Sequence, residues 1–220
     1  MNVSEALIER KSVRAFLPKL VNREDIEKIL SFARHAPSGT NTQPWHVAVV
    51  TGDTKSELES ELLAAFQNGA TKDMDYLYYP TEFSREMKQR RLACGLQMYQ
   101  TLGIQRGENE KRLAQWGLNY SAFGAPVMLF IFAPRCIEKG SFMDCGMFIQ
   151  SILLMATELG FSTCAQAALA EYPSIVRHKL GYSDDMLLLC GIALGYEDKS
   201  APINSYRTPR EEISKFTKFF

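Results

Sequence analysis

Apolar residues recur with helical spacing in four segments of the chain. A short segment follows Ser4, which we predict to be its N-cap, and a second follows Asn22. Residues 55–67 and 83–102 keep the same three- and four-residue spacing over longer distances. The pattern therefore predicts four helices, each with one apolar face.

Three short apolar runs, residues 46–52, 126–133 and 186–196, indicate strands in a buried sheet. Residues 142–160 are apolar on nearly every side, which indicates a helix deep inside the protein. Sheet and helices together predict an α+β fold, a three-layer α/β/α sandwich, over a single domain of residues 1–220.

Two features do not suit a self-contained monomer. The helix predicted within residues 142–159 has little polar surface to offer to water. The tail, residues 198–220, ends in "ISKFTKFF", which is too aromatic for a free terminus and too polar to build its own core. We predict a homodimer in which this tail wraps the partner subunit. The alternative is a tail that docks on its own domain.

Charge and composition narrow the function classes. Lys and Arg number 25 and so do Asp and Glu, and 46% of the 220 residues are hydrophobic. Because nucleic-acid binding needs a broad basic surface, we expect no nucleic-acid partner.

Cysteine usage and hydropathy indicate the compartment. The five cysteines are odd in number and form no CxxC pair, which is typical of a reduced, cytoplasmic protein. The N-terminus lacks a signal-peptide pattern and the longest uninterrupted apolar run, "APVMLFIFAP", is too short to cross a bilayer, so we expect no membrane segment. The three histidines lack metal-ligand spacing, and we expect no metal site.

The stretch "RKSVRAF" concentrates cations near the N-terminus. In an extended segment Arg10, Ser12 and Arg14 point to one side and form a potential phosphate site, because arginine offers paired donors and serine adds a hydroxyl. The alternative is a solvated charged face. A second polar stretch, "HAPSGTNTQPWH" at residues 35–46, offers many hydrogen-bonding groups to a flat heteroaromatic ring, although a surface turn is the better interpretation of this stretch taken alone.

Four segments in this order resemble the nitroreductase family of FMN-dependent oxidoreductases: "RKSVRAF", "APSGTNTQPWHV", "GFSTCAQAAL" and "GIALGYEDKSAPINSYRTPREEI". The resemblance spans essentially the whole chain. Its middle part, including "YLYYP" and "NYSAFGAPV", is similar to the branch typified by nitrobenzoate reductases.

The resemblance implies a domain-swapped homodimer with two FMN sites, each built from both subunits. It implies cofactor-binding roles for residues of the basic stretch, the polar loop, the segment after the central helix and the C-terminal motif: Arg10, Lys11, Ser12, Arg14, Pro37, Ser38, Gly39, Asn41, Gln43, Asn119, Ala165, Gln166, Ala167, Ala168, Asn204 and Arg207. Ser205 departs from the pattern, since several members carry a lysine there, and the missing cation implies a lower flavin potential.

The implied reaction is ping-pong: NADH or NADPH reduces the flavin, and a flat acceptor such as a nitroaromatic or a quinone then takes its place. The chemistry occurs on the flavin, so no catalytic side chain is expected. Aromatic residues are expected to line the acceptor slot, with helix packing as their alternative role: Tyr76, Tyr78, Tyr79 and Phe83. Two other functions stay open, a reductive dehalogenase of halogenated aromatics on the same fold and a non-catalytic flavin sensor or storage protein.

Overall fold

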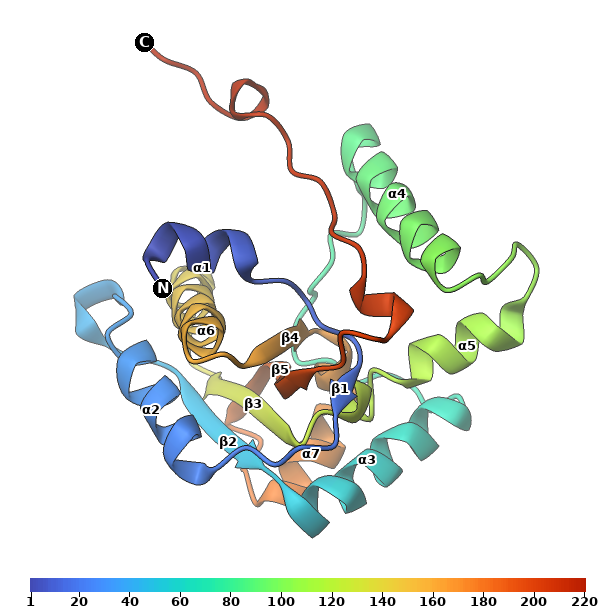
Figure 1. Ribbon diagram of the computed structural model, residues 1–220. Helices are drawn as coiled ribbons and strands as arrows, with labels where there is room; N and C mark the ends of the chain where they lie inside the picture. Colours follow the sequence, from blue (N-terminus) through green and yellow to red (C-terminus); the bar gives the residue numbers. More distant parts are fainter.

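The computed structural model describes residues 1–220 and is built around one antiparallel sheet (Figure 1). The strand order is β1-β5-β3-β2. Strand β4 also pairs with β5, on the same edge as β1 and opposite to β3. The strands are β1 (Phe16–Leu17), β2 (His46–Val50), β3 (Val127–Pro134), β4 (Ser162–Gln166) and β5 (Met186–Glu197).

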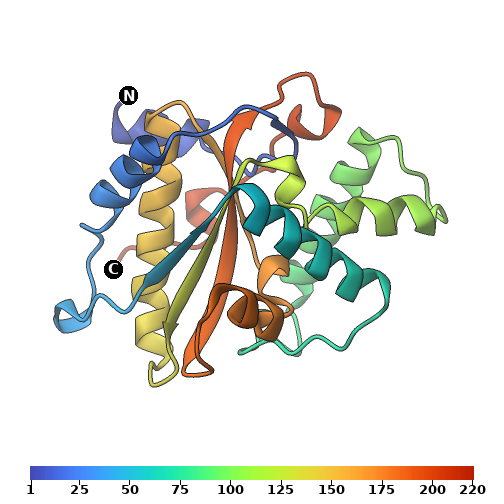
Figure 2. The same ribbon diagram turned by 90° about the horizontal axis from the view of Figure 1, so that it is seen from below.

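Helices cover both faces of this sheet, as Figure 2 shows from below. The helices are α1 (Val3–Glu9), α2 (Arg23–Ala33), α3 (Gly52–Gln67), α4 (Arg85–Thr101), α5 (Asn109–Gly117), α6 (Lys139–Glu158) and α7 (Pro173–Leu180). Alternate side chains of β3 enter two separate cores: Leu129 and Ile131 face α2 and α6, whereas Phe130 and Phe132 face α3 and α7. A strand buried on both faces needs apolar residues at every position, which explains the continuous apolar runs. The predicted three-layer α+β fold is confirmed.

The N-cap of α1 and several short elements differ from the sequence-based expectations. The N-cap of α1 is Asn2 and not Ser4, because Asn2 and Glu5 form a reciprocal capping box, with both hydrogen bonds at 2.9 Å. Helices α5 and α7 and strand β4 were not predicted, since each is shorter than ten residues and shows no clear period.

Helix α6 is the predicted central helix, and it is covered on one side only. Its length and composition would allow it to span a membrane, a test that buried helices of water-soluble proteins also pass, and 28% of the apolar window is buried. No membrane segment was expected here from the sequence, because scattered polar residues divide this helix into short apolar runs. Phe148 and Ile152 are buried against the sheet, whereas Met143 and Met147 remain exposed, so the uncovered side is apolar.

The C-terminal tail leaves the body of the protein (Figure 1). Its last ion pair or side-chain hydrogen bond with the body joins Glu211 and Arg90, at 3.0 Å. Beyond it Phe216 and Phe219 are 71% and 91% exposed. Residues 198–211 therefore lie against their own domain, where Ile203 and Asn204 are buried, whereas the aromatic end of the tail does not dock on it.

Candidate active site

The basic stretch runs as an extended segment from the end of α1 to the edge of β4. The backbone N–H of Val13 donates to the carbonyl of Thr163 at 3.0 Å, and Ser12 forms a parallel bridge with the same residue. Val13 is buried in the core, so the flanking residues Ser12 and Arg14 turn outward. These two residues line a cavity of about 350 Å³ together with Arg10.

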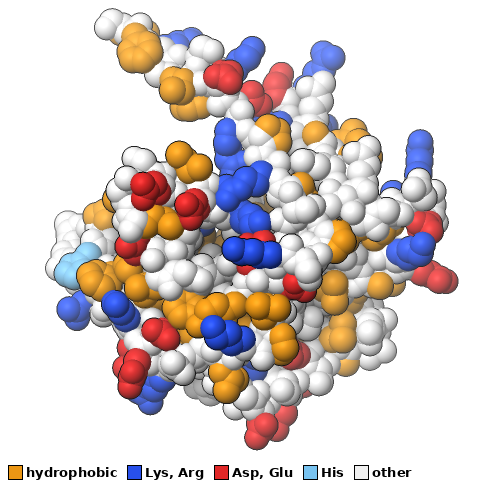
Figure 3. Space-filling model, viewed as in Figure 1, with side chains coloured by type: hydrophobic (Ala, Val, Ile, Leu, Met, Phe, Trp, Pro, Cys, Tyr) orange, Lys and Arg blue, Asp and Glu red, His pale blue; other side chains and the backbone are white.

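This cavity is strongly positive. Arg207 and Arg210 from the tail also line it, and Figure 3 shows basic side chains gathered over this part of the surface. Neither Arg10 nor Arg14 has an acidic partner within ion-pair distance. Burial, and then the charges of Arg210 and Arg207, lower the pKa of the Arg10 guanidinium. The cluster therefore has the charge and the arrangement of donors that an anion-binding site requires.

Two of the predicted cofactor-binding residues, Lys11 and Arg207, have partners within the chain. The ammonium of Lys11 contacts Glu197 at 2.6 Å and the carbonyl of Asn204 at 2.7 Å. Arg207 donates to the last carbonyls of α1, at Ile8 and Glu9. The first pair holds the basic stretch against the end of β5, and the second pair holds the tail against α1.

Asn204 is buried and its side-chain amide is fully engaged. The amide nitrogen donates to the carbonyls of Ala15 and Asp198, each at 2.9 Å, and the amide oxygen accepts from the backbone N–H of Arg14 at 2.8 Å. No N–H of this amide is left for a cofactor. Asn204 therefore holds the backbone of Arg14 in position.

The predicted segment Ala165–Ala168 forms the outer edge of the sheet beside the basic cavity. Apart from the bridge at Thr163, no strand pairs with this edge of β4, so its backbone groups are accessible to a ligand. The short helical turn that follows is pressed close to β5, because a Cβ on Gly191 would lie only 2.4 Å from Leu169. Gly191 thus allows the turn to continue the edge of β4.

Gln166 holds an unused hydrogen-bond acceptor at this edge. The side chain is 4% exposed, and its nitrogen donates to the carbonyl oxygen of Asn119 at 3.0 Å and to its side-chain oxygen at 3.2 Å. The donation to a carbonyl fixes which end of the amide is nitrogen. The buried Oε1 has no partner within the chain, which marks it as a place for a ligand's N–H or O–H group.

Two further cavities continue from this edge. One of about 410 Å³ shares Arg14 and Tyr206 with the basic cavity and also contacts Gln166 and Asn119. Another, of about 380 Å³, contacts Gln166 from the other side. Since neighbouring cavities share lining residues, the three form one trough that is basic at one end and aromatic at the other.

The segment before α4 supplies the aromatic end. Tyr76 is half-buried and donates to the carbonyl of Leu189 at 2.6 Å, whereas Tyr78 and Tyr79 are 51% and 54% exposed. Residues 68–84 contain no helix, but Tyr76 packs against the core and against Phe142 of α6, with ring centres 5.1 Å apart, as the alternative role of helix packing requires. Tyr76 and Tyr78 line the 380 Å³ cavity, and Tyr78 and Tyr79 line the 410 Å³ cavity. Phe83 lines neither of the two.

The polar loop does not reach this trough within one chain. None of its predicted residues lines the three cavities: Pro37, Ser38, Gly39, Asn41 and Gln43. The loop is instead fixed to α6, where the N–H of Gly39 donates to Asp144 at 3.2 Å. Thr40, Asn41 and Gln43 all have positive φ, a strained backbone typical of binding loops.

Sequence analysis missed several residues that line the 410 Å³ cavity. Cys94 and Arg91 come from α4, and Trp116 comes from α5. Glu171 lines the wall, accepts a hydrogen bond from buried Tyr120 and pairs with Lys72 at 2.8 Å. Burial, and then the contact with Glu171, raise the pKa of Tyr120, which keeps its proton. Among the lining residues that were not predicted, Tyr206 lies next to a predicted site residue, Arg207 in the C-terminal motif.

The nitroreductase family model matches residues 7–196. The chain belongs to the nitroreductase family. It is similar to a 4-nitrobenzoate reductase of Pseudomonas putida, with 38% identity over 210 residues that cover 96% of this chain and 92% of the relative. The nitroreductase fold is also shown by solved structures of two relatives.

The first is an FMN- and NADPH-dependent nitroreductase NfnB from Sphigopyxis sp. strain HMH, with a TM-score of 0.96, 36% identity, and coverage of 100% of this chain and 99% of the other. The second is the FMN-dependent nitroreductase NfnB from Mycobacterium smegmatis in complex with NADPH, with a TM-score of 0.94, 35% identity, and coverage of 99% and 98%.

Proposed function

We propose that this nitroreductase binds FMN and uses NADH or NADPH to reduce nitroaromatics, quinones or similar flat acceptors. The observation that carries the proposal is the trough that joins the unpaired Arg10 and Arg14 to the open edge of β4. An FMN molecule has the matching parts, a phosphate at one end and a flat ring with hydrogen-bonding groups at the other. The relatives named above support the same function.

Different residues of the trough bind different parts of FMN. Arg10, Ser12 and Arg14 bind its phosphate through charge-assisted hydrogen bonds. Backbone groups of Ala165–Ala168 would hold the ring, and the unpartnered oxygen of Gln166 would accept a hydrogen bond from it. Bound FMN supplies the hydride chemistry, while the protein orients the reactants and keeps water away.

The polar loop, α6 and the tail support a homodimer of single-domain subunits, and we propose from the cysteine usage that it acts in the cytoplasm. The strained loop needs a ligand that its own chain does not bring to it, and a partner's trough provides one. The exposed methionines of α6 and the exposed phenylalanines of the tail provide apolar surface for the partner. We therefore propose that loop residues 37–43 of one subunit complete the flavin site of the other, and that the tail wraps the partner.

The two rival functions suit this site less well. A reductive dehalogenase on this fold needs side chains that bind a zwitterionic substrate. The carboxylate of Asp75 is not free for this role, because it is buried between Arg135 at 2.8 Å and Arg177 at 2.6 Å. A storage protein needs no space beside its flavin, whereas the trough continues into the aromatic 380 Å³ cavity lined by Tyr76 and Tyr78. That additional space favours an enzyme with an acceptor site.

The purified protein is expected to be yellow and to contain about one FMN per chain. With a nitroaromatic or quinone as acceptor, it is expected to oxidise NADPH or NADH over many turnovers. Absorbance spectra after release of the flavin measure the first property, and the rate of nicotinamide oxidation measures the second. A colourless protein that does not take up added FMN would refute the proposal.

Arg14→Ala is expected to weaken FMN binding by about 1.5–3 kcal/mol, since it removes a charge-assisted contact with the phosphate. Titration of the flavin-free protein, followed by flavin fluorescence, gives the affinity. Riboflavin lacks the phosphate, so its affinity should change little. Arg34→Ala, at the exposed end of α2, is the matched control and should leave both affinities unchanged. Equal losses for FMN and riboflavin would contradict the assignment.

A further inference from the structure

Arg91 stands at the outer wall of the trough with its charge uncompensated. Its guanidinium carbon lies 4.2 Å from the ring centre of Phe83 and 5.1 Å from that of Tyr79. Contact with two aromatic rings restrains the guanidinium. No carboxylate lies within ion-pair distance of Arg91, although its neighbour Arg90 pairs with Glu211.

Stacking on rings occupies the face of a guanidinium and leaves its N–H edge free. Arg91 donates no hydrogen bond within the chain, whereas Arg90 donates one to Glu211. The free edge offers paired parallel donors, the arrangement that matches a carboxylate.

The charges around the 410 Å³ cavity indicate which ligand the N–H edge of Arg91 binds. Arg14 and Arg91 are its only cationic lining residues, and Arg14 belongs to the phosphate end. The only acidic lining residue, Glu171, is neutralised by Lys72. A single guanidinium beside aromatic walls suits a singly charged aromatic acid, whereas the phosphate end gathers several arginines.

We infer that Arg91 binds the carboxylate of an aromatic acceptor and makes this enzyme selective for aromatic acids over neutral nitroarenes. The inference rests on the proposed function. The acceptor's ring lies beside Tyr78, and its carboxylate meets the N–H edge of Arg91. The phosphate of NADPH is the competing source of negative charge, and the test separates the two.

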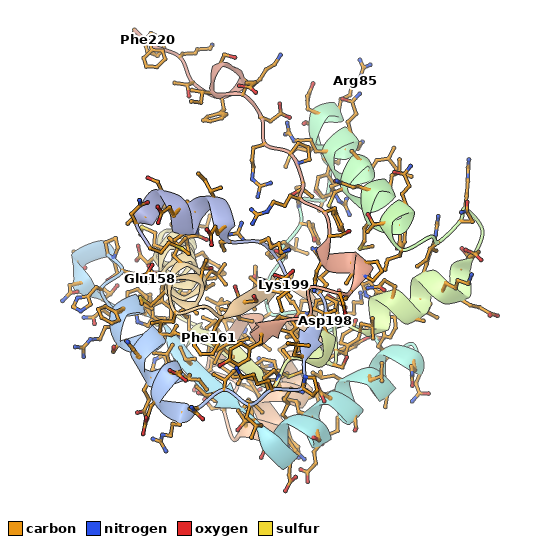
Figure 4. All side chains as sticks on the ribbon, viewed as in Figure 1. Arg85, Glu158, Phe161, Asp198, Lys199 and Phe220 are labelled. Carbon is orange, nitrogen blue, oxygen red and sulfur yellow. The ribbon has the colours of Figure 1, made fainter.

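Arg91→Gln and Arg91→Lys are compared with the wild type in FMN-loaded enzyme, with 4-nitrobenzoate and nitrobenzene as acceptors. The KM for 4-nitrobenzoate should rise about 10- to 100-fold in Arg91→Gln, the effect of losing a charge-assisted pair, while that for nitrobenzene changes far less. Arg91→Lys keeps the charge without the fork and should give an intermediate KM. Arg85→Gln is the matched control, because Arg85 lies at the outer end of α4, away from the trough, and should change neither KM (Figure 4).

Other outcomes would overturn the inference. Equal increases for both acceptors would mean that Arg91 only packs against the aromatic wall. A rise in KM for NADPH without a rise for NADH or 4-nitrobenzoate would assign Arg91 to the donor's phosphate.

Calorimetric titration with benzoate and benzamide tests the site without turnover. Wild-type protein should bind benzoate more tightly than benzamide, and Arg91→Gln should lose this preference. If the wild type bound benzoate no more tightly than benzamide, the Arg91 site would be refuted even if the protein is an active nitroreductase. A protein that shows the preference but reduces no acceptor would support the site and refute the proposed function.

Discussion

Deletion of residues 213–220 is expected to dissociate the dimer and to release bound FMN. The deletion removes Phe216, Phe219 and Phe220, which lie in solvent in the single chain. Burial of each aromatic side chain against a partner is worth about 1.5–3 kcal/mol, so their joint loss is a large part of a dimer's stability. Because a ligand held by two chains stabilises only their assembled form, flavin and dimer should be lost together.

Sedimentation velocity with detection at flavin wavelengths measures both effects in one experiment. The paired substitution of Lys215→Ala and Lys218→Ala removes the charges of the tail and keeps its phenylalanines, so this control should remain a yellow dimer. A truncated protein that stays dimeric and keeps its flavin would show that the tail does not hold the partner.

Asp75→Ala is expected to destabilise the protein by about 3–5 kcal/mol, the range for breaking a buried ion pair from one side. The carboxylate is buried, binds Arg135 and Arg177, and accepts the backbone N–H of Leu188 at 2.9 Å. Its removal leaves the buried guanidinium of Arg177 without its main partner. The same contacts fix the chain just before Tyr76, so the acceptor slot should loosen as well.

Urea unfolding gives the free energy, and the KM for a nitroarene reports on the slot. Asp184→Ala is the matched control, since this carboxylate also pairs with Arg177, at 3.2 Å, but is 96% exposed. Exposed pairs contribute little, so the control should stay close to the wild type. Similar losses in both variants would show that the buried carboxylate has no special role.

Much of the fold was predictable because β3 and β5 are buried on both faces. Such strands need apolar residues throughout, and "MLLLCGIALGY" shows this directly. Strand β4 gave no such signal, since it is five residues long and contains Ser162, Thr163 and Gln166. Its position depends on pairing with β5, a long-range contact that no local pattern encodes.

The basic end of the site was also predictable, because Arg10 and Arg14 lie close together in the sequence and in space. The aromatic end was only partly predictable. Tyr78 and Tyr79 stand beside each other in "YLYYP", but Arg91 and Cys94 join them only through the fold. Helix α4 has no buried residue, so its pattern does not show which of its polar side chains face a cavity.

Partners within the chain explain the remaining differences. Lys11 was grouped with the cofactor-binding residues, but its ammonium pairs with Glu197, 186 residues away in the sequence. Asn204 was grouped with the cofactor contacts, but its amide supports the backbone of Arg14. Sequence shows which groups are able to bind a phosphate, and only the folded chain shows which of them already have partners.

Anaerobic titration of the purified protein separates the two halves of the proposed reaction and tests the central claim most directly. Addition of NADPH or NADH should bleach the flavin absorbance with about one equivalent per chain. Subsequent addition of 4-nitrobenzoate, without oxygen, should restore the absorbance and yield a reduced nitrogen product. A protein whose bound flavin is not reduced by either nicotinamide, or whose reduced flavin is not reoxidised by any nitroaromatic or quinone, would contradict the proposed function.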